Sequence, residues 1–104
     1  MGEISWSLTA QKNLEAIADY IAKDSPYYAV NFVNRIMRYA ETLGNLPELG
    51  RMVPEFNDKN IRELIFHNYR IVYKLQREEV FIVAVTHGSV DITRKLKRER
   101  WEIG

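Results

Sequence analysis

A single arginine interrupts an apolar stretch in the second half of the chain. Arg70 lies in the run Tyr-Arg-Ile-Val-Tyr at residues 69–73. A guanidinium carries five N–H donors in a planar fork and stays protonated, so it suits a phosphate or a carboxylate. Two interpretations follow. Arg70 contacts an anionic partner, or it is a structural arginine paired with Glu63 or another carboxylate.

His87 is the side chain best suited to move a proton. It ends an apolar run just before Gly88, and an imidazole ordinarily titrates near neutral pH. The alternative is a strand-end histidine bonded to Asp91 or to a backbone group. His67 and His87 are 20 residues apart, which is no metal-ligand spacing, and the chain has no cysteine. We therefore expect no metal site.

The C-terminal stretch gathers cations around one aromatic ring. Residues 59–104 carry ten Lys and Arg against six Asp and Glu, whereas the whole chain has a net charge of only +1. Such a cluster suits an acidic partner, and equally a solvated helix whose cations lie near its C-terminal end. The residues concerned are Arg94, Lys95, Lys97, Arg98, Arg100 and Trp101.

The elements that must position these side chains begin with two helices. Apolar residues at positions 14, 17, 18 and 21 recur with helical spacing, and Thr9 is a suitable N-cap. Ser25 and Pro26 are typical of a second helix start, and Gly44 of its end. A connection of about three residues between the helices implies an antiparallel αα-hairpin.

Strands are predicted on both sides of this hairpin. Residues 4–8 alternate apolar and polar, and three later runs cover Ile61–Phe66, Tyr69–Gln76 and residues 80–87. Residues 47–60 read as a polar loop. The sequence therefore predicts an α+β fold. It comprises an N-terminal strand, an αα-hairpin packed on one face of a twisted, mainly antiparallel four-stranded sheet, and a short C-terminal helix.

Alternation along Tyr69–Gln76 predicts which side chains share a face. The larger apolar set, which is Tyr69, Ile71, Tyr73 and Leu75, should face the helices. Arg70 and Lys74 should then lie on an open opposite face, which makes that face a candidate binding site. The length of 104 residues fits a single domain over residues 1–104. No signal peptide or membrane-spanning run is present, so we expect a cytoplasmic protein.

The order and spacing of several motifs resemble the RelE/ParE superfamily of small bacterial and archaeal toxins. The resemblance covers nearly the whole chain. It rests on the helix pair with Ser25-Pro26, and on four further motifs. These are Leu-Gly-Arg at 49–51, Arg-Glu-Leu at 62–64, Tyr-Arg-Ile-Val-Tyr at 69–73 and Val-Thr-His-Gly-Ser-Val-Asp at 85–91. It implies the toxin of a type II toxin–antitoxin module, which stabilises plasmids by addiction.

Departures from the family pattern favour the ParE-like subclass. Of the basic residues that RelE-type mRNA endonucleases carry, only the strand arginine remains, as Arg70. Ile61 and Glu63 stand at basic positions of the second strand, Val90 at a later arginine, and Leu96 at the C-terminal tyrosine. Arginine cannot act as a base, so the RNase chemistry is largely missing. The resemblance then implies inhibition of DNA gyrase or a related target through protein contact.

Two alternatives stay open at this point. In a ribosome-dependent mRNA interferase, Arg70 would hold the scissile phosphate, with His87 or Glu55 as the base. In a decayed relative, the chain would bind its antitoxin without toxicity. Whether the protein is an enzyme is thus undecided by the sequence.

The resemblance also implies partners and the residues that contact them. We expect no cofactor. The expected antitoxin has an acidic-hydrophobic C-terminal segment that covers the helical hairpin and the sheet edge or open face, and a homodimer or toxin–antitoxin heterotetramer is possible. The candidate contacts for the target, which is gyrase or the ribosome with mRNA, are Arg70, Lys74, Arg94, Lys95, Arg98 and Trp101.

Overall fold

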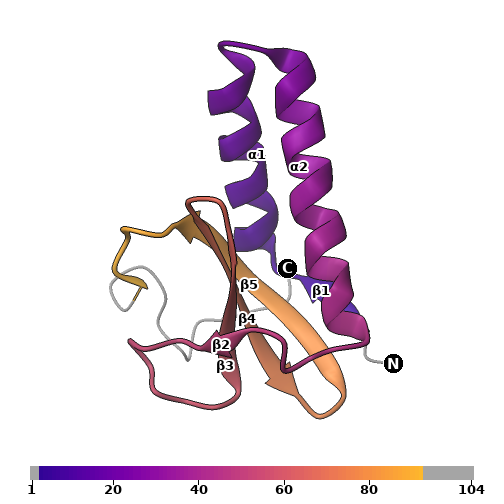
Figure 1. Cartoon of the computed structure of the whole chain (residues 1–104), viewed down its shortest axis with the longest axis vertical. Helices are drawn as coiled ribbons and strands as arrows, with labels where there is room; N and C mark the ends of the chain where they lie inside the picture. Colours follow the sequence, from indigo (N-terminus) through magenta and orange to yellow (C-terminus); the bar gives the residue numbers. More distant parts are fainter. Residues whose placement is uncertain (1–2, 93–104) are drawn as a thin grey trace.

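A pair of antiparallel helices packs on one face of a twisted five-stranded sheet (Figure 1). The computed structural model describes residues 3–92. The helices are α1 (Leu8–Ala22) and α2 (Pro26–Glu41), followed by a short 3-10 helix, η1 (Thr42–Gly44). The strands are β1 (Ile4–Trp6), β2 (Arg51–Met52), β3 (Ile61–Phe66), β4 (Tyr69–Gln76) and β5 (Glu79–His87). Within the described residues no helix is long and apolar enough to cross a membrane.

The strand order is β1-β5-β4-β3-β2, with β1 parallel to β5 and every other pair antiparallel. The predicted α+β class, helical hairpin and mainly antiparallel sheet are confirmed. The sheet has five strands rather than four because two residues of the predicted loop, Arg51 and Met52, pair with β3. A strand this short leaves no alternation in the sequence to detect. The predicted C-terminal helix lies outside the described residues.

Ser7 starts α1 and also ties it to the sheet. Its Oγ accepts from the N–H of Ala10 at 2.9 Å and donates to the carbonyl of Val83 at 2.9 Å. Its own N–H donates to the carbonyl of Ile82 at 2.9 Å. The expected cap at Thr9 is therefore wrong by two residues, because β1 ends at Trp6 and the helix begins at once. The start of α2 is as predicted, since Ser25 Oγ accepts from the N–H of Tyr28 at 3.1 Å and Pro26 is the first helical residue.

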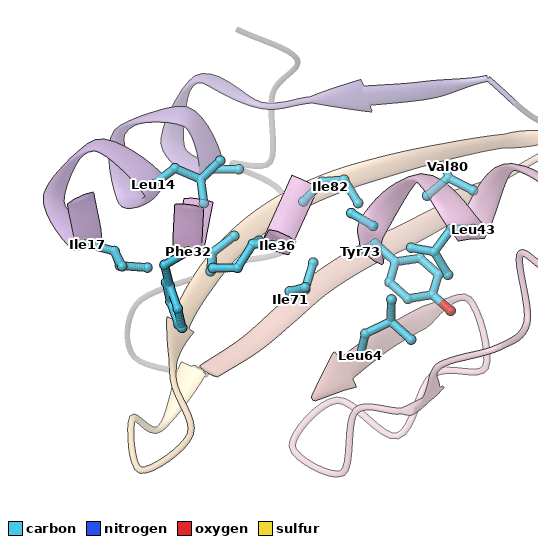
Figure 2. Close-up of a cluster of buried hydrophobic side chains, with 13 residues drawn as sticks. Leu14, Ile17, Phe32, Ile36, Leu43, Leu64, Ile71, Tyr73, Val80 and Ile82 are labelled. Atoms are coloured by element: carbon cyan, nitrogen blue, oxygen red, sulfur yellow. The ribbon is translucent and has the colours of Figure 1, made fainter. Parts of the chain in front are cut away.

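The main core fills the space between the helices and the sheet (Figure 2). Ile36 of α2 lies next to Ile71 of β4, whereas Tyr73 lies beside Leu43 and Leu64 at one end of the cluster. Phe32 and Ile17 lie at the other end. The face of β4 predicted to meet the helices is thus confirmed. Burial of these side chains at roughly 25 cal/mol per Å² of apolar surface is what holds the hairpin on the sheet.

A second, smaller core covers the opposite face of the sheet. It contains Val53 of the loop between β2 and β3, Val72 of β4, Phe81 and Val83 of β5, and Ile92 after β5. A register shift opposite the Val72–Tyr73 step of β4 lets Val83 and its neighbour in β5 both serve this core. The expectation of an open face here is wrong, because residues 53–56 and 92 fold over it.

Gly50 lies where the loop before β2 packs closely against the sheet. Its N–H donates to Tyr73 Oη at 2.9 Å, and a Cβ there would lie 2.5 Å from the carbonyl oxygen of Glu63 and 2.7 Å from that Oη. We expect Gly50→Ala to lower the free energy of unfolding by about 1–3 kcal/mol, since backbone must move to make room. Urea unfolding measures this. Gly88→Ala, whose Cβ would meet nothing closer than 3.3 Å, is the control, and an equal loss in both variants would contradict the argument.

Candidate functional site

The predicted site arginine is buried in an ion-pair network rather than exposed. Arg70 is 6% exposed, and its Nε donates to Glu63 Oε1 at 2.5 Å. Its two terminal nitrogens donate to Glu55 at 2.7 and 2.8 Å, and one of them also reaches the carbonyl of Val90 at 3.2 Å. Four of the five N–H donors are therefore occupied. The expectation that Arg70 lies on an open face is wrong, and the alternative pairing with Glu63 is what the structure contains.

Two residues outside the predicted site complete this network. Glu63 is 1% exposed, and its second carboxylate oxygen accepts from Arg51 Nε at 2.6 Å. Arg51 is itself largely solvent-exposed. The two positive charges of the guanidiniums balance the two negative charges of the carboxylates. The buried carboxylate of Glu63 is neutralised by one arginine at each of its oxygens. The sequence contained a hint of this network. Glu63 stands where the RelE-type pattern has a basic residue, and Arg51 ends the Leu-Gly-Arg motif.

Glu55 is held as an ionised partner of Arg70. The hydrogen bonds from Arg70 lower the pKa of this carboxyl from 4.5 to about 2, against a smaller opposing effect of burial. A general base works best when its pKa lies near the operating pH, and a carboxylate this acidic is a weak one. The geometry therefore gives Glu55 the chemistry of a loop anchor, joining residues 53–60 to β4.

The lowered pKa of Glu55 makes one contribution to stability pH-dependent. Since the folded-state pKa lies below the ordinary value, this contribution is present above about pH 4.5 and is lost as pH falls toward 2. We expect Glu55→Gln to be less stable than the parent at pH 7, with the difference shrinking below pH 4.5. Urea unfolding from pH 7 to pH 3 measures it. The control is Glu48→Gln, because the exposed carboxylate of Glu48 lies 3.7 Å from Arg62. A difference in stability between Glu55→Gln and the parent that stays constant with pH would refute the assignment.

His87 lies on the other side of the sheet from Arg70. It pairs in register with Tyr69, whose ring centre is 5.8 Å from the imidazole, and Tyr69 packs against the helix-side core. Its Nδ1 lies 2.8 Å from Ser89 Oγ and accepts from the N–H of Ser89 at 3.2 Å. The predicted strand-end histidine bonded to a backbone group is thus confirmed. The sheet separates His87 from Arg70, and the two cannot act on one phosphate.

Of the remaining predicted contact residues, the structure describes only Lys74. Lys74 is half-buried four residues further along β4, roughly 13 Å away at the rise of a strand. Arg94, Lys95, Arg98 and Trp101 lie outside the described residues. Within residues 3–92 no group of three or more His, Asp or Glu side chains is arranged to hold a metal ion.

The hairpin offers a groove that the sequence pattern did not single out. Residues of α1 and α2 near the connection between the helices line a hollow of about 350 Å³. This connection is at the end of the hairpin away from the sheet (Figure 1). Small and apolar side chains line it, and Val30 beside it is 63% exposed. The lining residues are Ala18, Asp19, Ala22, Pro26, Ala29, Val30, Val33 and Asn34. Small residues let a second helix approach closely, so this groove suits an amphipathic segment of a partner.

Comparison with known proteins gives a consistent result. A family model described as the ParE toxin of the type II toxin–antitoxin system parDE matches residues 4–92. A protein named Toxin RelE2 from Caulobacter vibrioides is 32% identical over 90 residues, covering 86% of this chain and 98% of that protein. Putative toxin Y4kP from Sinorhizobium fredii is 36% identical over 87 residues, covering 82% of this chain and 86% of that one.

A solved structure shares the fold. A chain from the structure titled "Chromosomal ParDE TA system from P. aeruginosa" superposes with a TM-score of 0.71 at 21% identity. The match covers 84% of this chain and 96% of that chain. The two proteins thus share this fold over most of their length.

Proposed function

Since this chain belongs to the ParE family of toxins from type II toxin–antitoxin systems, we propose that it inhibits DNA gyrase or a related target by protein contact. The observation that supports contact over RNA cleavage is the state of Arg70, which has four of its five donors occupied by its own protein. An arginine in this state has one N–H left for a scissile phosphate. No cofactor is needed for inhibition by contact, and the module would serve to stabilise the replicon that carries it.

The cognate antitoxin is expected to occupy the groove of the hairpin. An acidic-hydrophobic segment that is disordered alone can fold as a helix with its apolar side in such a groove. The exposed Val30 and the small Ala18 and Ala22 would receive its apolar anchors. The sequence suggested that the antitoxin segment also covers the second face of the sheet. That face is already covered by the smaller core, so the antitoxin is expected on the hairpin alone.

A paired assay tests the proposal in purified components and in cells. The protein is added to gyrase with relaxed plasmid and ATP, and supercoiling and trapped cleaved DNA are followed on gels. Total mRNA integrity is followed in parallel after induction in cells. Lost supercoiling or cleaved DNA with intact mRNA supports gyrase as the target. Rapid mRNA fragmentation with normal DNA would overturn the proposal in favour of an interferase, and continued growth with neither change would leave an antitoxin-binding role alone.

A further inference from the structure

One side of α2 combines arginines, a tyrosine and an amide without a carboxylate. Tyr27, Asn31, Arg35 and Arg38 recur at i, i+4, i+8 and i+11, so they share one side of the helix, which we call the arginine–tyrosine face. All four are exposed, and Tyr27 is 82% exposed. The one acidic residue of α2 is its last, Glu41, which lies three residues after Arg38 and outside this face, and within residues 3–92 no ion pair engages Arg35 or Arg38.

The sheet holds part of this face in place. The guanidinium of Arg35 lies 5.4 Å from the ring centre of Phe66, and one of its terminal nitrogens is 3.4 Å from His67 Nε2 in the β3–β4 turn. Since arginine only donates, this nitrogen of His67 accepts. Arg35 is thus oriented before any partner arrives, which reduces the entropy lost on binding.

We propose that the arginine–tyrosine face is the surface through which the toxin contacts its target, and that the matching surface of the target is acidic. This inference rests on the proposed function and adds the contact surface to it. Tyr and Arg are the residues whose truncation most often costs affinity at protein interfaces. Two exposed guanidiniums that form no ion pair within residues 3–92 fit carboxylates on the partner.

The face is distinct from the groove assigned to the antitoxin. Residues Ala29, Phe32, Ile36 and Ala40 mark the core side of α2, and the groove lies along Pro26, Val30 and Val33. Tyr27 and Arg38 border the groove on the adjoining side of the helix, since Tyr27 comes three residues before Val30 and Arg38 four residues after Asn34, which also lines the groove. A helix with these separate sides can carry a polar contact for the target and an apolar one for the antitoxin.

Matched double variants test the assignment. Arg35→Ala/Arg38→Ala and Lys12→Ala/Lys23→Ala remove the same charge, one pair from the arginine–tyrosine face and the other from α1. Gyrase supercoiling is titrated with each purified variant, antitoxin binding is measured by calorimetry, and folding by urea unfolding. We expect the arginine variant to need roughly 10- to 100-fold more protein for half inhibition, at unchanged antitoxin affinity. The lysine variant should match the parent, and Tyr27→Ala should follow the arginine variant.

The outcomes separate this inference from the proposed function. If the parent protein does not affect gyrase, the proposed function fails before the variants are compared. If the parent inhibits and the folded arginine variant inhibits equally, the face is not the contact surface. Loss of antitoxin binding in the arginine variant would reassign the face to the antitoxin. Salt-sensitive binding of the parent to a labelled DNA duplex, lost in the arginine variant, would reassign it to nucleic acid.

Discussion

Replacing Arg70 with methionine should lower the free energy of unfolding by roughly 3–5 kcal/mol, because it leaves the carboxylate of Glu63 buried with only the exposed Arg51 as a partner. The double variant Arg70→Met/Glu63→Leu should recover most of that loss. Apolar residues of similar volume often replace a buried ion pair without cost, and the partners left over, Glu55 and Arg51, both reach solvent. Urea unfolding of the two variants measures the difference.

The same pair of variants decides whether the guanidinium has a direct role. Lys74→Met removes a half-buried cation from the same strand and face and should change stability little. If Arg70 only holds the loop and β4 together, the single variant should lose inhibition through unfolding and the double variant should regain it. A double variant that folds with near-parent stability yet is inert would contradict this. It would return Arg70 to the role of contacting phosphate or target.

Local sequence signals predicted the elements well where one residue type decides the geometry. Ser25 followed by Pro26 favours a helix start in any context, and alternation along β4 assigned Tyr73 and Val72 to opposite faces. The cap of α1 was harder. Ser7 and Thr9 are both good N-caps, and only the hydrogen bond from Ser7 to the β5 backbone, distant in sequence, selects between them.

The candidate site could not be predicted from alternation alone. Alternation states that Arg70 and Lys74 share a face, but says nothing about what covers that face. Val53 and Ile92 cover that face. They come from a loop and from the segment after β5, where the sequence has no periodic pattern that would predict which side chains are buried. The separation of His87 from Arg70 also depends on the register of β4 against β5, which pairs His87 with Tyr69. The residue types of His87 and Arg70 suggested a shared catalytic role, whereas the strand register places the two side chains on opposite faces of the sheet.

Placing a carboxylate in the hairpin groove should uncouple toxin from antitoxin. Val30→Glu puts a negative charge in the lining of an apolar groove. It also removes an apolar side chain that is 63% exposed and so open to contact with a partner. Burial of a valine side chain is worth about 1.5–3 kcal/mol, and an acidic antitoxin segment would also be repelled. We expect antitoxin affinity to fall roughly 100-fold, as measured by calorimetry.

Toxicity provides the second measurement for this variant. Because Val30 borders the arginine–tyrosine face without belonging to it, Val30→Glu should inhibit the target as the parent does, and co-expressed antitoxin should no longer restore growth. Ala16→Glu adds the same charge to an exposed position of α1 outside the groove, and should be neutralised normally. Normal neutralisation of Val30→Glu would show that the antitoxin binds elsewhere. Loss of toxicity in a folded Val30→Glu protein would instead show that target and antitoxin compete for one side of α2.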